Sequence, residues 1–447
     1  MEEEKGKSAH VLVLLSLCRG HINPMLHFAD RLAINGLRAT LVVPIQNRGD
    51  IGKADPRAVA AACLEYISDG YDDGLPSNFD VEIYRTTFQC VGSKKLLELI
   101  ARLTVEGPRP VCLIYDSFLS WALELAHAHG LLGATFITQP LAVCLMYCYY
   151  GCGLQINPDM CVFLPRMPPL GLRDLPSFIA QPESNPLILE MMLGQFKNMG
   201  KADFVLVNSF DKLEEEARKE MVEPWSLKMI WPEHESHPAD CLRWLDERPD
   251  SSVVYVSFGS LATLPAEQME EIANALLSSN RPFLWVVKAP YAHQKGGNSL
   301  PEGFVEATSE QGLVVPWCPQ LHVLAHRGVG CFVTHCGWNS TLEGLSQGVP
   351  MVTVPQRRYH PTNAKFVSDV WITGARLEVG NKGFVLKGEL ERCIREVMEG
   401  ERGAHIRANA QRWRDQAREA VAEGGPSDNN VKEFVTKVPF LLLDREK

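Results

Sequence analysis

Two residues that follow apolar runs, His21 and Asp116, are of the right types for acid–base chemistry. His21 comes after the run His10–Leu15, and Asp116 closes a second run, Val111–Tyr115. Free imidazole titrates at about pH 6.5, so a histidine can take a proton from a hydroxyl near neutral pH. A carboxylate that accepts from the other ring nitrogen would fix the tautomer and stabilise the imidazolium. Singly, each residue has an ordinary interpretation, as a loop histidine or a helix cap, so the pair is the informative unit.

A cluster of small and polar residues, His335–Ser340, lies where the apolar run Gly330–Thr334 gives way to a helical pattern. The start of a helix presents unpaired backbone N–H groups and the positive end of the helix dipole, which suits a phosphate. The histidine, asparagine and serine of the cluster add side-chain donors. Phe258–Ser260, at the end of another apolar run, allows close backbone approach. The alternative is that Asn339 and Ser340 only cap the helix.

Several other kinds of site are excluded. The chain has no G-x-G-x-x-G after the first apolar run and no G-x-x-x-x-G-K-[ST], so neither a conventional NAD site nor a P-loop is expected. His234 and His237 are three apart beside two prolines, whereas a helical zinc motif needs histidines four apart. We therefore expect no metal site.

The segments that must position these residues alternate between short apolar runs and amphipathic stretches, which predicts parallel sheets covered on both faces. Predicted strands of the first half are His10–Leu15, Ala39–Val43, Val111–Tyr115, Ala134–Thr138 and Phe204–Asn208, the last of the series. Predicted strands of the second half are Val253–Phe258, Phe283–Lys288, Val314–Pro316, Gly330–Thr334 and Met351–Val354. The first helix is expected to have Asn23 as N-cap and Pro24 at its first position.

The pattern predicts an α/β protein with two doubly wound Rossmann-like domains facing a cleft. We expect an N-terminal acceptor-binding domain at residues 1–230, a linker at 231–239 and a second domain at 240–425. Residues 426–447 are expected to form a helix that packs back on the first domain. In such sheets ligands bind beyond the carboxyl ends of the strands, where the candidate residues stand.

The polar residues of the second half also resemble a known motif, the signature box of plant family-1 UDP-glycosyltransferases. The residues that carry this resemblance are Trp317–Gln320, His335–Ser340, Glu343, Gly348–Pro350 and, in the flank, Pro361–Lys365. Similar stretches outside the box are Gly20–Pro24, Tyr115–Asp116, Ala202–Phe210 and Gly424–Gly425, so the resemblance covers nearly the whole chain. It is strongest to the branch that acts on phenolic and carboxylic small molecules.

This resemblance implies a GT-B fold and inverting transfer of a hexose, foremost glucose, from a UDP-sugar to a hydroxyl or carboxylate of a small hydrophobic molecule. The UDP-sugar is a co-substrate, and no cofactor is implied. His21 and Asp116 would be catalytic. Trp317 would stack on uracil, with core packing as the alternative. Gln320 and Glu343 would contact the ribose, and the residues implied for the diphosphate are His335, Asn339, Ser340 and Ser260. The Trp338 backbone N–H and Thr138 would contact the sugar. The residues implied elsewhere in the donor site are Cys318, Gly337, Tyr359 and His360.

Two of these implied roles have alternatives that involve no ligand. Trp338 is a large aromatic residue that could simply fill a core. Glu343 could lie on a solvated helix face.

The end of the box departs from the family. The family has Trp-Thr-Asp/Glu-Gln where this chain has Arg357–His360. Tyr359 cannot replace a carboxylate as a two-oxygen acceptor, and a histidine at the position of His360 resembles members that prefer UDP-galactose. The arginines add positive charge, which favours an acidic sugar or acceptor. The alternative function is therefore a UDP-galactose-preferring or catalytically impaired homologue that binds small molecules.

The composition of the chain limits the kinds of partner that it could bind. A formal net charge of −10 over 447 residues argues against a nucleic-acid-binding protein, which needs clustered Lys and Arg. No stretch approaches the roughly 20 apolar residues that span a bilayer. We expect a cytoplasmic monomer whose partners are a UDP-sugar and a small-molecule acceptor.

Overall fold

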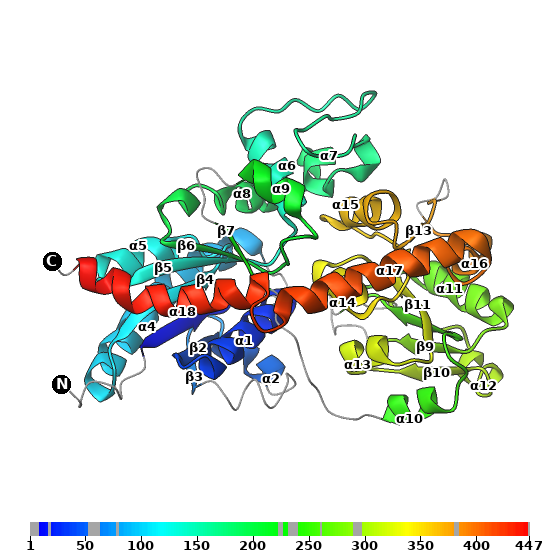
Figure 1. Ribbon diagram of the computed structural model, residues 1–447, viewed down its shortest axis with the longest axis horizontal. Coiled ribbons are helices and arrows are strands. Elements are labelled where there is room, and N and C mark those ends of the chain that lie inside the picture. The colour runs from blue at the N-terminus through cyan, green and yellow to red at the C-terminus, as the bar shows by residue number, and fades with distance from the viewer. Residues whose placement is uncertain are drawn as a thin grey trace.

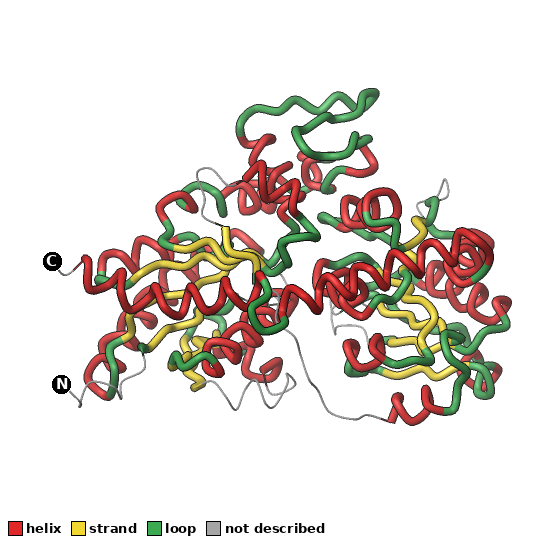
Figure 2. Tube along the Cα trace, viewed as in Figure 1, coloured by secondary structure: helices red, strands yellow, loops and turns green. Residues whose placement is uncertain are grey.

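Two parallel β-sheets, with helices on both faces of each, form the framework of the molecule (Figure 1, Figure 2). The computed structural model describes residues 9–16, 19–51, 63–76, 80–221, 227–230, 240–259, 262–288, 297–379 and 384–445. Every strand pair in both sheets is parallel, so each connection must cross over the sheet, and helices make these crossovers. The predicted α/β class with two Rossmann-like sheets is confirmed.

The first sheet has seven strands in the order β3-β2-β1-β4-β5-β6-β7. Its strands are β1 (His10–Leu14), β2 (Arg38–Pro44), β3 (Cys63–Ile67), β4 (Pro110–Asp116), β5 (Leu132–Ile137), β6 (Phe204–Val207) and β7 (Leu227–Met229). Its helices are α1 (Arg19–Ile34), α2 (Arg48–Ile51), α4 (Val81–Glu106), α5 (Trp121–Ala128), α6 (Leu141–Gly151), α7 (Ser177–Ala180), α8 (Pro186–Gly194) and α9 (Glu215–Met221). Strand β1 pairs with β2 on one side and β4 on the other, so the strand order reverses between β1 and β4.

The second sheet has six strands in the order β10-β9-β8-β11-β12-β13. Its strands are β8 (Val253–Ser257), β9 (Phe283–Val286), β10 (Gly312–Val315), β11 (Val329–Thr334), β12 (Met351–Thr353) and β13 (Gly374–Arg376). Its helices are α10 (Asp240–Asp246), α11 (Ala266–Ser279), α12 (Phe304–Ala307), α13 (Gln320–Ala325), α14 (Trp338–Gln347), α15 (His360–Lys365), α16 (Lys387–Met398) and α17 (Gly400–Val421). Here the strand order reverses between β8 and β11.

The last helix, α18 (Pro426–Arg445), returns to the first sheet. Figure 1 shows it in red beside α1 and the strands of that sheet. Phe434 is fully buried there, and its ring centroid lies 4.8 Å from that of Phe204 and 5.9 Å from that of Phe28. The apolar core on this face of the first sheet therefore includes residues from both ends of the chain.

The predicted start of the first helix is wrong. Helix α1 begins at Arg19, so Asn23 is not its N-cap and Pro24 lies inside the helix. Proline has no N–H, and the backbone carbonyl four residues earlier, that of Gly20, loses its usual helical donor. This carbonyl is satisfied from the second sheet, as described below.

Three strands, β3, β7 and β13, were not predicted, and β7 rather than β6 ends the first series. The predicted linker, residues 231–239, lies outside the described residues, and the proposed domain limits stay a prediction. Among the described helices, none is both long and apolar enough to cross a bilayer.

Candidate active site

The predicted acid–base pair lies at the point where the strand order of the first sheet reverses. His21 stands in the first turn of α1, directly after β1, and Asp116 is the last residue of the neighbouring strand β4. The Nδ1 atom of His21 and the Oδ2 atom of Asp116 are 2.7 Å apart. Asp116 is fully buried and His21 is 8% exposed, so the pair is largely shielded from water. This geometry leaves the Nε2 atom of His21 as the one to receive a proton.

Asp116 is held by two further donors. The Ser16 hydroxyl donates to its Oδ2 over 2.6 Å, and the backbone N–H of Phe118 donates to its Oδ1 over 3.0 Å. Burial alone would raise the pKa of this carboxyl, but the charge of His21 and these hydrogen bonds bring the pKa below its ordinary value. Asp116 is therefore an anion across the neutral range. Sequence reasoning missed Ser16, although it stands just before the loop that leads to His21.

His335 occupies the corresponding reversal point of the second sheet, directly after β11. A Cβ added to Gly259 would come within 2.6 Å of its ring, and one added to Gly337 within 2.5 Å. The imidazole fits only because both neighbours are glycines. Burial, assisted by the positive charge of Arg358, lowers the pKa of His335 to about 4, so the ring is neutral at pH 7. Its Nδ1 atom has no hydrogen-bond partner among the described residues.

Helix α14 begins beside His335 without a side-chain cap. Gly337 is the N-cap residue, and glycine has no side chain with which to cap the first N–H groups of the helix. Ser340 instead accepts from Gln320, and Asn339 donates to Gly20. The interpretation of Asn339 and Ser340 as simple caps is therefore not supported, and the anion site predicted at this helix start stays a prediction.

Gln320, Ser340 and Glu343 lie together on α13 and α14. The Nε2 atom of Gln320 is 2.7 Å from Oε2 of Glu343 and 3.0 Å from Oγ of Ser340. Tyr255 fixes the amide by donating to its Oε1 atom over 3.1 Å. Burial raises the pKa of Glu343 to about 7, against the lowering effect of the Gln320 hydrogen bond. Glu343 is partly buried rather than on a solvated face, so that alternative is not supported.

The two tryptophans of the signature box lie in opposite environments. Trp317 is 66% exposed, which argues against a core role. Trp338 is 1% exposed, and its Nε1 donates to the carbonyl of Asn208 over 2.8 Å. The side chain of Trp338 is therefore part of the core, leaving only its backbone for a ligand. Cys318 is also buried, with its sulfur 3.2 Å from the Tyr255 hydroxyl.

Tyr359 and His360, at the end of the signature box, lie near His335. The rings of His335 and His360 are perpendicular, with centroids 4.9 Å apart, and Tyr359 packs edge-on against His360 at 5.5 Å. Burial, then the neighbouring His335 and Arg358, lower the pKa of His360.

Thr138 follows β5 and is buried, and its hydroxyl has no partner among the described residues. Ser260 lies outside the described residues.

A short bridge joins the two halves of the site. The Nδ2 atom of Asn339 donates to the carbonyl of Gly20 over 2.7 Å, and its Oδ1 accepts from Nδ2 of Asn208 over 3.3 Å. Gly20 immediately precedes His21, so the start of α14 and the first turn of α1 are in direct contact. Within the described ranges, no cluster of three or more His, Cys, Asp or Glu residues could hold a metal ion.

A second bridge, which the sequence did not predict, involves the 3₁₀ turn η2 (Leu172–Asp174). Asp174 forms an ion pair with Arg376 at the end of β13, and its carbonyl accepts from the Thr362 hydroxyl over 2.7 Å. The Arg376 guanidinium also donates to the carbonyl of Arg173 over 2.8 Å. This contact docks a loop of the first half onto α15, which begins with His360.

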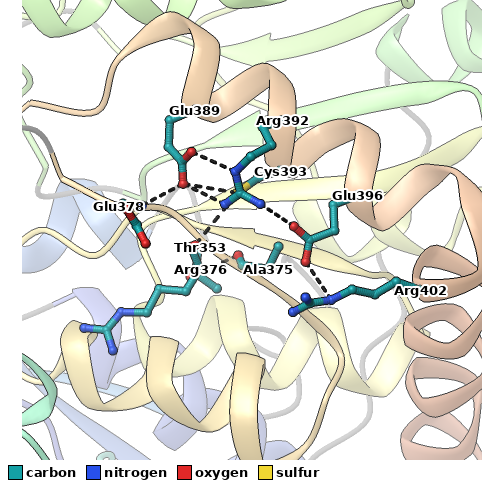
Figure 3. Close-up of polar contacts among 9 residues, drawn as sticks. All are labelled: Thr353, Ala375, Arg376, Glu378, Glu389, Arg392, Cys393, Glu396 and Arg402. Carbon is teal, nitrogen blue, oxygen red and sulfur yellow. Dashed lines mark hydrogen bonds and ion pairs between the residues drawn. The ribbon is translucent and has the colours of Figure 1, made fainter.

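A network of charged residues on α16 contacts the backbone just after β13. Arg392 donates to Glu389 over 2.7 and 2.8 Å and to Glu396 over 2.5 Å, and the backbone N–H of Glu378 donates to Glu389 over 3.0 Å. Figure 3 shows Arg392 between the two carboxylates, with the Arg376 guanidinium pointing away from them. Arg376 is thus free to pair with Asp174 rather than with these acids.

Comparisons with known proteins agree with this geometry. Residues 197–407 match the sequence profile described as "UDP-glucoronosyl and UDP-glucosyl transferase". The chain is 40% identical to UDP-glycosyltransferase 74E2 of Arabidopsis thaliana, over 96% of this chain and 99% of the relative. It is also 40% identical to a flavonol 7-O-beta-glucosyltransferase of the same plant, over 98% and 99%. The crystal structure of Os79 from O. sativa with UDP superposes with a TM-score of 0.86 at 36% identity, over 96% and 100% of the two chains.

Proposed function

This chain belongs to the plant UDP-glycosyltransferase family, and we propose that it transfers glucose from UDP-glucose to an oxygen of a small hydrophobic acceptor. The observation that carries the proposal is the buried His21–Asp116 pair, 2.7 Å apart, at the edge of the first sheet that contacts the start of α14. A base on one sheet and an anion site on the other are what transfer from a nucleotide diphosphate requires.

His21 acts as the general base. Its Nε2 takes the proton from an acceptor hydroxyl while Asp116 accepts from Nδ1 and stabilises the imidazolium that forms. A carboxylic acceptor is already ionised near neutral pH and needs orientation rather than deprotonation. The acceptor oxygen attacks the anomeric carbon opposite the departing UDP, so the configuration inverts.

The second half holds the donor. The N–H groups at the start of α14 and four side chains bind the diphosphate and stabilise the negative charge that develops on UDP. These side chains are His335, Asn339, Ser340 and Ser260. Because His335 is neutral at pH 7, it contributes a hydrogen bond rather than a charge. Glycine at position 337 gives the phosphates close access to the backbone.

The nucleoside and the sugar have separate contacts. Trp317 stacks on the uracil, and Gln320 and Glu343 accept from or donate to the ribose hydroxyls, with Cys318 packed behind them. The backbone N–H of Trp338 and the side chains of Thr138, Tyr359 and His360 face the hexose. We further propose that the enzyme is a cytoplasmic monomer that needs no metal or other cofactor.

The acceptor is a small hydrophobic molecule that carries a hydroxyl or a carboxylate group. One relative is named as a flavonol glucosyltransferase, and a rice neighbour was crystallised with a trichothecene, at 37% identity and a TM-score of 0.86. Flavonols and trichothecenes both carry hydroxyl groups on a largely apolar frame, which suits a base whose ring lies 5.0 Å from that of Phe118.

A donor panel tests this function. The enzyme is incubated with UDP-glucose, UDP-galactose or UDP-glucuronate and a set of phenols and aromatic acids, and UDP release is measured. We expect the fastest release with UDP-glucose and none above background for His21→Ala. Preference for UDP-galactose or UDP-glucuronate would reassign the donor. Binding of UDP without turnover for any pair would identify a non-catalytic binder instead.

A further inference from the structure

The first turn of α1 contains a carbonyl group that the helix itself cannot satisfy in the usual way. In an α-helix, the carbonyl of residue 20 accepts from the N–H of residue 24. Here residue 24 is Pro24, which has no N–H and lies inside α1 (Arg19–Ile34). The unsatisfied carbonyl is that of Gly20, the residue before His21.

Asn339 supplies the missing donor from the second sheet. Its Nδ2 atom is 2.7 Å from the carbonyl oxygen of Gly20. Its Oδ1 accepts from Nδ2 of Asn208 over 3.3 Å, and this second bond fixes the orientation of the carboxamide. A reversed carboxamide would place oxygen against the Gly20 carbonyl and NH₂ against the Asn208 amide group, losing both bonds. The backbone of Asn208 is itself held in place, because its backbone carbonyl accepts from Nε1 of Trp338.

His21 stands between the two ends of this arrangement, one residue after Gly20 and three before Pro24. Its imidazole is oriented by Asp116 through Nδ1, but its backbone belongs to the turn that Asn339 secures. We propose that Asn339 is a positioning residue for His21, because it gives the first turn of α1 the hydrogen bond that Pro24 withholds. The base is thereby held in place only while the donor-binding half is docked against the first sheet.

This inference rests on the proposed function of His21 as the base. It gives Asn339 a role that Ser340 and His335, its neighbours at the start of α14, do not share. Besides its expected contact with the diphosphate, Asn339 acts on kcat through α1.

A double-mutant cycle tests the assignment. In Pro24→Ala the new N–H donates to the Gly20 carbonyl within the helix, so the Asn339 bond becomes dispensable. We expect Asn339→Ala to lower kcat about tenfold in the wild-type background, which corresponds to the loss of one hydrogen bond. In the Pro24→Ala background the same substitution should lower kcat less than about threefold. Calorimetry should show the same change in the UDP Kd on Asn339→Ala in both backgrounds, because Pro24 takes no part in binding the diphosphate.

Three other outcomes would overturn the proposal while the wild-type enzyme remains active. These are independent effects of Pro24→Ala and Asn339→Ala on kcat, a weaker UDP Kd with unchanged kcat, or no effect of Asn339→Ala at all. Should Pro24→Ala fail to fold, Asn208→Ala decides, because it removes only the amide that orients Asn339. We expect it to lower kcat about threefold with UDP affinity unchanged, and an unchanged kcat would refute the assignment. Absence of turnover in the wild-type enzyme would instead refute the proposed function.

Discussion

Asp174 and Arg376 form an ion pair that joins the loop before α7 to the edge strand β13 of the other sheet. Their side chains are 14% and 24% exposed, so the pair is only partly screened by water. Removal of the carboxylate in Asp174→Ala leaves Arg376 only its bond to the Arg173 carbonyl and loosens the contact next to α15. We expect a loss of stability of about 1–3 kcal/mol and a several-fold higher KM for UDP-glucose. Both effects of the substitution should be smaller at high salt, because salt already weakens the ion pair in the wild-type enzyme.

The matched control for this prediction is Glu216→Ala. Glu216 pairs with Arg166 over 2.9 Å, but both side chains are about half exposed and both belong to the first half. This variant should change neither stability nor KM measurably. Equal effects of the two variants, or none from Asp174→Ala, would show that the second bridge is unimportant.

Replacement of Asp116 by asparagine tests the acid–base pair. The amide keeps the shape of the carboxylate but cannot stabilise an imidazolium, and it favours the wrong tautomer of His21. We expect kcat to fall about 10³–10⁴-fold, with UDP affinity within about twofold of wild type. Asp246→Asn is the control, because Asp246 also contacts a histidine, His326, at 3.1 Å, yet lies away from the site. Retention of more than a tenth of kcat in Asp116→Asn would contradict the assigned role.

Glu343 makes donor binding pH-dependent. Because its pKa is raised to about 7, the carboxyl group is mostly protonated at pH 6 and mostly ionised at pH 8. Only the ionised form accepts from two ribose hydroxyls, so affinity should increase as pH rises through 7. Calorimetry with UDP-glucose should show roughly tenfold tighter binding at pH 8 than at pH 6. Glu343→Gln should bind weakly with no such slope, and parallel curves for the two proteins would count against this role.

Glu214 should make stability fall as pH rises. It is 5% exposed, and burial raises its pKa to about 7, although it accepts from the N–H of Ala142. The unfolded chain loses this proton at about pH 4.5 and the folded chain at about pH 7, so the folded state is favoured less as pH increases between these values. Above pH 7 the effect is constant.

Glu214→Gln removes this dependence. Relative to wild type, the variant should gain stability between pH 5 and pH 8, by about 3 kcal/mol at most. Thermal unfolding followed by fluorescence at these two pH values measures the difference. The adjacent, more exposed Glu215 provides a control, since Glu215→Gln should shift both melting curves little. A gain for Glu214→Gln that is the same at both pH values would exclude titration as its cause.

The two tryptophans of the signature box should separate binding from folding. Trp317→Ala should weaken UDP binding by about 1–3 kcal/mol, the value of one stacked base, and leave stability nearly unchanged because the ring is 66% exposed. Trp338→Ala should cost about 3–5 kcal/mol of stability, because that ring is 1% exposed. Both are measured by calorimetry and thermal melting. A destabilised Trp317→Ala would show that its ring packs on the protein after all.

The sequence predicted the central strands because their burial is complete. Every residue of β1 and of β11 is buried, which requires the continuous apolar runs that were recognised. The missed strands β3, β7 and β13 are all at sheet edges, and β7 and β13 have three residues each. An edge strand needs no continuous apolar run, so its pattern is too weak to stand out.

Most of the candidate site was predictable because its residues stand in local motifs at strand ends. What the sequence could not predict are partners that come together only through the fold, such as Ser16 with Asp116 or Asp174 with Arg376. The start of α1 was misjudged for a related reason. Proline at the first helical position is a local preference, and here a distant residue, Asn339, compensates for its place inside the helix.

The return of α18 to the first sheet sets a rule for exchanging parts between related enzymes. Phe434 is enclosed by Phe28 and Phe204, so the final helix is a structural member of the first half although it follows the second in sequence. A chimera joined at a single point would pair this helix with a foreign surface and break the aromatic cluster. Donor halves should therefore be transplanted as an internal cassette with two junctions, the second between α17 and α18.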